Sequence, residues 1–559
     1  MCPRPLAAVS LALLLAACAA PPHGPSTVAC AGLPSALSAI PRLAFSRAVL
    51  APADDQGHGA HCLVQGTLNE RSGRDGRRYA IGFEMRLPVA WNKRFLHQVN
   101  GGDDGEVMPA WGGLEVMAGD ALSRGFAVIS SDSGHRADDP TNAAAGLARG
   151  QVFGLDAQAR RDDGYTATAA LFPVAQALVE RHYGERPQRN YMAGCSNGGR
   201  HAMVAASRQG DRYDGLLAGA PGLNLPKAAV QHAWDVQSWK RVDDDIRKAF
   251  SPADLKLVAD RVLARCDGLD LLVDGVVGDL RRCQQAFRLD ELQCTGAKAA
   301  GCLSGSQVQA LQRVFDGPRD SAGQALYSPW SFDSGIGAAG WRQWKIESAV
   351  PGWNRMPIIA TMGAASLAHV FTTPPTPVAG TPAALLDFLT RFDFDRDAPK
   401  IFATDRRFRE SAMAVMTPPD ADNPQLATLA ARGGKLLVYH GVSDPVFSVN
   451  DTLRWVERLQ ANRGLAGANA VARVFPVPGM GHCQGGPATD RFDALGALVD
   501  WVENGRPPDR LVAGVDPRNP ELPAGWSPAR TRPLCPWPQI ARYRGGNVES
   551  ADSFRCSPP

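Results

Sequence analysis

The sequence lacks an excess of charge of either sign. Its 59 Lys and Arg residues nearly balance its 56 Asp and Glu residues, which leaves a formal net charge of +3. This balance excludes an electrostatic nucleic-acid binder, because such a protein needs a basic excess to neutralise phosphates. Hydrophobic residues make up 45% and charged residues 21%, which excludes a disordered chain. We expect the 559 residues to form a globular α/β protein of roughly one to three domains.

The chain also lacks a hydrophobic run long enough to span a bilayer, which takes roughly 20 residues. The apolar stretch from Leu6 to Ala17 follows a single charge, Arg4, and is typical of a signal peptide. Residues 15–18, Leu-Ala-Ala-Cys, resemble the lipobox of bacterial lipoproteins. We therefore expect a lipoprotein-type signal peptide over 1–18 and a lipid anchor at Cys18, with an ordinary secretory signal cut near Ala20 as the alternative. Either predicts an exported protein, periplasmic, on the outer membrane or secreted.

No C-x-x-C pair occurs, which argues against zinc ligation. Of the 12 cysteines, ten remain once Cys2 and Cys18 of the signal are set aside, and this even number fits disulfides in an oxidising compartment. Their spacing favours four pairs: Cys30 with Cys62, Cys266 with Cys283, Cys294 with Cys302, and Cys535 with Cys556. Cys195 and Cys483 are left over, far apart in the sequence.

Short apolar runs that end in polar loops alternate with helical stretches, which predicts an α/β fold with a mostly parallel sheet covered on both faces. Functional groups then belong at the carboxyl ends of the strands. The pattern changes between residues 223 and 431, which we interpret as an inserted lid domain between two parts of a core, 25–222 and 432–559. The expected strands are Arg94–Val99, Phe126–Ser130, Asn190–Ala193, Lys435–Tyr439 and Ala472–Val477.

The segment Gly194-Cys195-Ser196-Asn197-Gly198 has the form G-x-S-x-G between a predicted strand and a predicted helix. This is the context of a nucleophile elbow, in which a sharp turn raises the serine hydroxyl above the sheet. A glycine-rich loop without chemical meaning is the alternative. We identify Ser196 as the candidate nucleophile.

A serine nucleophile needs a base and an orienting carboxylate, which follow it in the order Ser…Asp…His in this kind of fold. Asp444 follows one late strand, and His482, the only histidine after Asp444, follows the next. His440 and His135 are rival bases, but both precede Asp444. We predict a triad of Ser196, Asp444 and His482.

The two leftover cysteines flank this triad: Cys195 precedes Ser196 and Cys483 follows His482. A disulfide requires Cα atoms within about 7 Å. If these cysteines join, they bring Ser196 and His482 together. The competing hypothesis is that Cys195 is itself a reactive thiol.

Cys195-Ser196, Asp444 and His482-Cys483 together resemble the CS-D-HC signature of the tannase/feruloyl esterase family. The resemblance covers nearly the whole mature chain. It implies an α/β-hydrolase fold with a large inserted lid, all five cysteine pairs, and hydrolysis of small aromatic esters of the feruloyl or galloyl type without an organic cofactor. A mono-hydroxyethyl terephthalate hydrolase, another kind of member, is the alternative.

An oxyanion site needs two preorganised N–H donors. The residue after the nucleophile, Asn197, supplies one by its position in the elbow. The other is expected from the glycine loop at residues 100–103, where the family resemblance indicates Gly102 and Gly101 is the near alternative.

Three carboxylates within eight residues, Asp267, Asp270 and Asp274, offer oxygen ligands to a hard cation. The spacing resembles the calcium loop of the family, which implies backbone carbonyl ligands at Leu272 and Val276 and a structural Ca²⁺ in the lid. An acidic solvated turn is the alternative.

The resemblance implies substrate contacts at Phe447, Trp353 and Phe371. Members that hydrolyse terephthalate monoesters use a lid arginine for the free carboxylate, and this chain carries Leu367 at the matching place, with Arg355 or His369 as substitutes. We therefore favour phenolic acyl groups. The remaining alternatives are a peptidase with the same triad and a non-catalytic binding lipoprotein.

Overall fold

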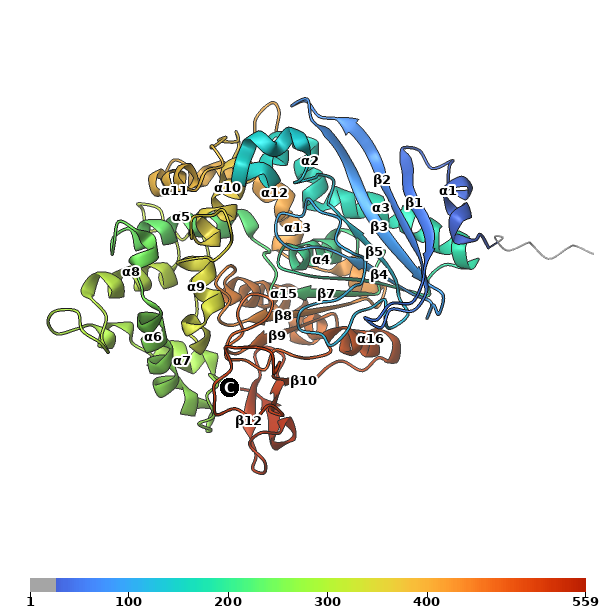
Figure 1. Cartoon of the computed structure of the whole chain (residues 1–559). Helices are drawn as coiled ribbons and strands as arrows, with labels where there is room; N and C mark the ends of the chain where they lie inside the picture. Colours follow the sequence, from blue (N-terminus) through green and yellow to red (C-terminus); the bar gives the residue numbers. More distant parts are fainter. Residues whose placement is uncertain (1–26) are drawn as a thin grey trace, which may run out of the picture.

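The computed structural model describes residues 27–559, so the expected signal peptide and Cys18 lie outside the described residues. Within this part of the chain, the main sheet has nine strands in the order β1-β2-β3-β5-β4-β6-β7-β8-β9 (Figure 1). The strands are β1 (Leu43–Ala51), β2 (His61–Ser72), β3 (Arg78–Pro88), β4 (Arg94–Gln98), β5 (Ala127–Ser131), β6 (Arg189–Cys195), β7 (Gly215–Gly219), β8 (Lys435–Gly441) and β9 (Ala472–Val477).

The sheet is parallel from β5 through β4, β6, β7 and β8 to β9, whereas β1, β2, β3 and β5 pair antiparallel. The five expected strands correspond to β4, β5, β6, β8 and β9, and no end differs by more than two residues. The sequence analysis did not identify β7, whose five residues include two glycines. The predicted fold class is confirmed.

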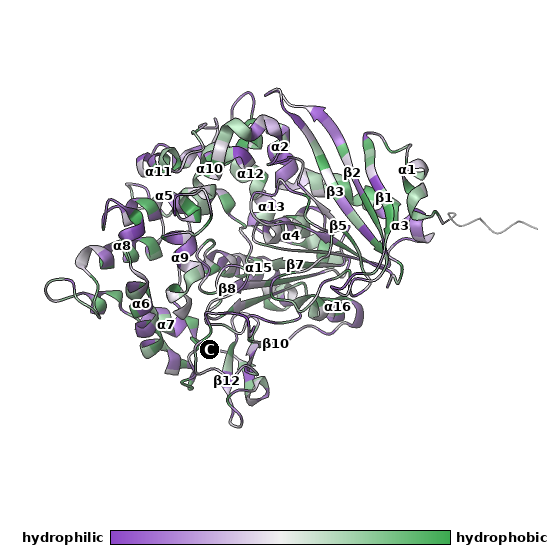
Figure 2. Cartoon of the chain, viewed as in Figure 1, coloured by the Kyte–Doolittle hydropathy of each residue, from purple (hydrophilic) through white to green (hydrophobic). Residues whose placement is uncertain are grey.

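Helices cover both faces of the sheet. Alternate residues of a strand point to opposite faces, so apolar side chains on both faces need a helix packed over them. Met192 of β6 packs in the cluster formed by α4 and α15, whereas its neighbours Tyr191 and Ala193 pack in the cluster that contains α16. α3 packs over β2–β5 at the other end. Both hydrophobic and hydrophilic residues occur along β2 (Figure 2), and its burial pattern changes from buried at the start of the strand to largely exposed at its end. These core helices are α1 (Leu33–Ala36), α2 (Ala157–Arg161), α3 (Ala167–Tyr183), α4 (Asn197–Arg208), α15 (Val449–Asn469) and α16 (Ala494–Asn504).

Between β7 and β8 the chain leaves the sheet and forms a largely helical segment, which we call the helical segment (residues 223–431) (Figure 1). It coincides with the expected lid, whose boundaries as a separate domain stay a prediction. None of the helices within residues 27–559 is long and apolar enough to cross a membrane. The helices of this segment are α5 (Leu225–Trp239), α6 (Pro252–Cys266), α7 (Leu280–Ala286), α8 (Gly305–Asp316), α9 (Ala339–Lys345), α10 (Met362–His369), α11 (Pro382–Arg391), α12 (Ala412–Met416), α13 (Pro419–Asp422) and α14 (Ala427–Ala431).

After α16 the chain ends in two small antiparallel pairs, β10 (Leu511–Gly514) with β11 (Thr531–Leu534) and β12 (Ile540–Tyr543) with β13 (Phe554–Ser557). All five expected disulfides are present. The bridges join Cys30 to Cys62, Cys195 to Cys483, Cys266 to Cys283, Cys294 to Cys302, and Cys535 to Cys556.

Close packing of α4 on β7 generates a stability prediction. A Cβ on Gly199 would lie 2.3 Å from the carbonyl oxygen of Gly219 and 3.0 Å from Cα of Pro221. We expect Gly199→Ala to lower the free energy of unfolding by about 1–3 kcal/mol, because rigid backbone must move to admit the methyl group. Gly59→Ala is the control, since a Cβ there meets no atom within 4 Å. The measurement is thermal unfolding of both variants. Equal melting temperatures for Gly199→Ala and Gly59→Ala would contradict the prediction.

Candidate active site

Ser196 lies in the sharp turn between the end of β6 and the start of α4. Its backbone has φ 65° and ψ −124°, a strained conformation for a residue with a side chain. The turn is held by hydrogen bonds, among them one of 2.9 Å from the N–H of Ser196 to the carbonyl of Gly219 in β7. The hydroxyl is thereby fixed at the carboxyl end of the parallel strands.

The structure brings the three predicted triad residues together in one hydrogen-bonded chain. Ser196 Oγ lies 2.9 Å from His482 Nε2, and His482 Nδ1 lies 2.7 Å from Asp444 Oδ2. Because a carboxylate only accepts, Nδ1 carries the proton and Nε2 is free to accept from the serine hydroxyl. The other Asp444 oxygen accepts the N–H groups of Val446 and Phe447 at 2.7 and 3.1 Å.

Asp444 is a buried but ionised carboxylate. Burial alone would raise its pKa, but the charge of His482, with hydrogen bonds from His440 and His482, outweighs burial and holds the pKa of Asp444 well below its usual range. The carboxylate is therefore negative at neutral pH and favours a protonated imidazole beside it.

The two rival histidines do not contact Ser196. His440 is fully buried, with Nε2 at 3.1 Å from the carbonyl of Phe447 and Nδ1 at 2.8 Å from the hydroxyl of Thr452. His135 is stacked on Phe153, and burial lowers its pKa to about 3. Neither ring is placed to take a proton from the serine.

The disulfide between Cys195 and Cys483 joins the nucleophile turn to the loop that carries His482, with a Cα–Cα distance of 6.1 Å. Since Cys195 is bonded, it is no free thiol, and the hypothesis of a cysteine nucleophile is wrong.

The candidate oxyanion amides lie on two sides of Ser196. Among the residues that the structure describes, none accepts a hydrogen bond from the N–H of Asn197, Gly101 or Gly102. Gly101 lies against the nucleophile, since a Cβ on it would be 3.4 Å from that of Ser196. Gly102 has φ 66°, in the left-handed region that favours glycine. Both glycines remain candidates for the second donor.

Two aromatic rings pack edge-on against the imidazole of His482. The Phe447 ring centroid is 5.4 Å away and that of Trp344, in α9, is 5.3 Å away. The family resemblance indicates Phe447, whereas the sequence analysis does not single out Trp344. Phe371 is buried in the same hydrophobic cluster as Phe447, and Trp353 is half-buried. Their roles as substrate contacts stay predictions.

Asp333 is a further residue of this region that the sequence analysis missed. It comes from the helical segment, and its Oδ2 accepts the N–H of Gly479 at 2.7 Å and the hydroxyl of Ser443 at 2.9 Å. It thereby ties together the loops that carry Asp444 and His482. No local pattern marks Asp333, because its partners are more than a hundred residues away.

The three residues considered as partners of a substrate carboxylate are buried or already paired. Leu367 is fully buried. Arg355 is exposed and forms an ion pair with Glu347. His369 Nε2 accepts the N–H of Val378 at 3.0 Å, and burial lowers its pKa, so it is a neutral ring.

The expected calcium loop is a buried carboxylate cluster. Asp267 accepts the backbone N–H groups of Asp274 and Gly275 at 2.9 and 2.8 Å. Burial, with the nearby charges of Asp274 and Asp267, raises the pKa of Asp270 to about 7. Asp274 Oδ1 is buried without a hydrogen-bond partner in the described residues. Concentrated negative charge and an unpartnered oxygen fit a hard cation.

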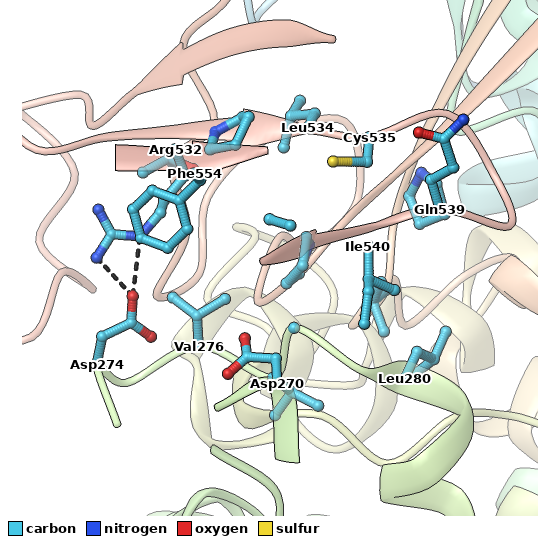
Figure 3. A pocket seen from close by; sticks show the side chains of 18 of the residues that line it. Asp270, Asp274, Val276, Leu280, Arg532, Leu534, Cys535, Gln539, Ile540 and Phe554 are labelled. Carbon is cyan, nitrogen blue, oxygen red and sulfur yellow. Dashed lines mark hydrogen bonds and ion pairs between the residues drawn. The ribbon is translucent and has the colours of Figure 1, made fainter. Parts of the chain in front are cut away.

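The other oxygen of Asp274 is engaged by the C-terminal strands. Figure 3 shows Asp274 turned toward Arg532 of β11, whose Nε lies 2.8 Å from Asp274 Oδ2. Arg530 also donates to the carbonyl of Asp274 at 2.8 Å. The loop thus joins the helical segment to the end of the chain, and a cation has one oxygen of Asp274 to bind.

Comparisons with known proteins agree with this geometry. The family model described as "Tannase and feruloyl esterase" matches residues 62–557. A mono(2-hydroxyethyl) terephthalate hydrolase of Piscinibacter sakaiensis is 40% identical over 94% of this chain and 89% of its own length. A probable feruloyl esterase of Arthroderma benhamiae is 28% identical over 89% of this chain and 85% of its own.

Among solved structures, feruloyl esterase B from Aspergillus oryzae has a TM-score of 0.72 at 21% identity and covers 94% of this chain and 99% of its own. Tannin acyl hydrolase from Aspergillus niger has a TM-score of 0.65 at 20% identity, over 93% and 92% of the two chains. These likenesses show the fold. With the family model over most of the chain and the relative at 40% identity, the predicted family and enzyme class are confirmed: the chain belongs to the tannase and feruloyl esterase family of carboxylic ester hydrolases.

Proposed function

We propose that this protein is a serine esterase that hydrolyses small aromatic carboxylic esters through an acyl-enzyme. The observation that carries the proposal is the unbroken hydrogen-bonded chain from Ser196 Oγ through His482 to Asp444. The chain alone fits any acyl transfer, and the family narrows it to carboxylic esters.

In the proposed reaction, Ser196 Oγ attacks the ester carbonyl while His482 Nε2 takes its proton. Asp444 keeps the ring oriented and stabilises the imidazolium. The amides of Asn197 and of Gly102 or Gly101 stabilise the oxyanion, each worth about 3 kcal/mol in the transition state. His482 then protonates the leaving alcohol, and water hydrolyses the acyl-enzyme by the reverse sequence.

The acyl group is aromatic in this proposal because the rings of Phe447 and Trp344 both pack beside His482, where they can contact a flat apolar group. Uncharged phenolic acyl groups are favoured, since Leu367 is apolar and Arg355 is already paired with Glu347. The second candidate, hydrolysis of mono-hydroxyethyl terephthalate, is favoured by the relative at 40% identity.

The proposal includes a structural Ca²⁺ bound by side-chain oxygens of Asp267, Asp270 and Asp274 and by the carbonyls of Leu272 and Val276. When bound, the cation supplies positive charge to the carboxylate cluster and no step of the hydrolysis. Its role is to fix the loop closed by the disulfide between Cys266 and Cys283.

Export also belongs to the proposal. The five disulfides fit an oxidising compartment. A signal peptide over 1–18, with lipidation of Cys18, would take the chain there.

Purified protein should release aromatic acids from methyl ferulate or methyl gallate, and Ser196→Ala should lower kcat/KM by at least about 1,000-fold, because the nucleophile is lost. A hydroxyethyl terephthalate monoester and an alkyl butyrate complete the panel of substrates. Hydrolysis of each ester is measured by chromatography of the released acid. Ser46→Ala, at an exposed serine, is the control.

The ranking of the panel decides between the two candidates. Faster turnover of the terephthalate monoester than of both phenolic esters would replace the phenolic assignment. No turnover of any ester by folded protein with its disulfides intact would refute the esterase and favour a binding protein.

The bridge between Cys195 and Cys483 should support both activity and stability. In the chain-entropy model, loss of the bridge that closes this long loop costs about 6 kcal/mol, against about 2.5 kcal/mol for the bridge that closes the short loop of Cys294 and Cys302. We expect the double variant Cys195→Ser/Cys483→Ser to have a lower kcat and a lower melting temperature than the wild type. We expect Cys294→Ser/Cys302→Ser to have a lower melting temperature and an unchanged kcat. Equal activities of the two double variants would show that the bridge does not hold the triad.

Removal of calcium should destabilise the protein. Excess EGTA should lower the melting temperature of the wild type and of Asp290→Ala, an exposed control, and added Ca²⁺ should restore it, since a ligand of the folded state stabilises by about 2.7 kcal/mol at 100 times its Kd. Asp270→Ala should abolish this response. A wild-type melting temperature that is indifferent to both EGTA and Ca²⁺ would remove the cation from the proposal.

A further inference from the structure

A buried polar network lies beneath the candidate oxyanion site, and the triad does not include it. Its centre is Asp104, the second residue after Gly102, whose side chain is fully buried. Asp104 Oδ2 lies 2.9 Å from Asn197 Nδ2 and 2.9 Å from His201 Nε2. One carboxylate oxygen thus binds two residues of the first turns of α4, including the residue that carries the elbow's oxyanion amide.

The side chain of Asn197 is held at its other end as well. Its Oδ1 accepts from Arg200 Nε at 2.6 Å. Arg200 is fully buried, and its remaining donors bind the carbonyls of Asp163 and Gly164 at 2.9 Å each. The side-chain amide of Asn197 is therefore held by the Arg200 guanidinium at one end and by the Asp104 carboxylate at the other.

Asp104 also fixes the shape of the glycine loop. Its N–H donates to the carbonyl of Gly101 at 3.3 Å, which closes a tight turn, and its own φ is 54°. The next residue back, Asp103, accepts the hydroxyl of Ser366 in α10 at 2.7 Å. The loop is consequently tied to α4 through Asp104 and to the helical segment through Asp103.

We propose that Asp104 is a positioning residue of the oxyanion site, whose carboxylate locks the loop of Gly101 and Gly102 against Asn197. Two amides on separate elements stabilise an oxyanion only when their separation is fixed before the reaction. No covalent link spans these elements, and the bond from Asp104 to Asn197 joins them directly. The inference rests on the proposed serine esterase function and deepens it.

The positioning role predicts a loss in kcat that KM does not share. Asp104→Ala should lower kcat about 10- to 100-fold, the effect of a displacement of about 1 Å, with KM changed less than about threefold. The inhibition constant of phenylboronic acid, whose adduct with the serine places an oxygen in the oxyanion site, should rise by a similar factor. Asp104→Asn keeps one acceptor oxygen, so its kcat should be intermediate between those of Asp104→Ala and the wild type. This variant provides the test if Asp104→Ala folds poorly.

Asp451→Ala is the matched control. Asp451 is also a buried aspartate that accepts from an asparagine, Asn224 Nδ2, at 2.9 Å, but it belongs to α15 and contacts neither Asn197 nor the glycine loop. It should lower the melting temperature and leave kcat within about twofold. A fall in kcat equal to that of Asp104→Ala would mean that loss of any such buried pair disturbs catalysis, and would overturn the inference.

A double-mutant cycle tests whether Asp104 acts through Asn197. Asp104→Ala should lower kcat by a factor that is at least threefold smaller in the Asn197→Ala background than in the wild type. If the two factors differ by less than threefold, the inference is overturned. Ester turnover by the wild type together with an unchanged kcat of Asp104→Ala would refute the inference alone. Absence of turnover by the wild type would refute the proposed esterase, and the positioning role with it.

Discussion

Direct backbone contact around the turn at Ser196 is the constraint on which the site depends. A Cβ on Gly198 would lie 2.3 Å from the carbonyl of Val99, and one on Gly199 equally close to that of Gly219. The elbow is therefore pressed against both the glycine loop that follows β4 and the end of β7. This contact, with the hydrogen bonds to the turn, offsets the strain of Ser196 and prevents relaxation to a common backbone conformation.

The rest of the triad reaches the elbow through the order of the parallel strands. β6, β7, β8 and β9 are consecutive neighbours in the sheet, so the loops after β6, β8 and β9 open at the same edge. The helical segment starts from this edge, at the carboxyl end of β7, and the parts of it that carry Asp333 and Trp344 contact the loops of Asp444 and His482 there. The bridge of Cys195 and Cys483 adds a covalent link to an arrangement that strand order already produces.

The sequence permitted prediction of those parts of the site that depend on local pattern and chain order. Ser196 is marked by its elbow, Asp444 and His482 by following apolar strands, and the disulfides by cysteine number and spacing. Asp333, Trp344 and Asp104 carry no such mark, because each acts through a partner that only the folded chain brings near. The same holds for β7, which pairs on both edges but has too few large apolar residues to be recognised as a strand.

Electrostatics explains how a site with so many acids can stabilise an oxyanion. An uncompensated carboxylate under the glycine loop would oppose the negative charge that develops on the substrate. Burial raises the pKa of Asp132 to about 8, so this group is largely protonated at neutral pH. Burial also raises the pKa of Asp163 well above its usual value. Asp104, whose pKa burial raises to about 7, lies close to Arg200.

The contrast with Asp444 follows from the partners of each carboxylate. Asp444 is equally buried, but the charge of His482 and the hydrogen bonds from His482 and His440 stabilise its ionised form. The charge that assists the imidazolium is therefore preserved on one side of Ser196. On the other side, burial disfavours the ionised form of the acids that anchor the oxyanion loop, and the positive charge of Arg200 compensates the negative charge that remains. Anchoring by a carboxylate is therefore compatible with binding an anion nearby.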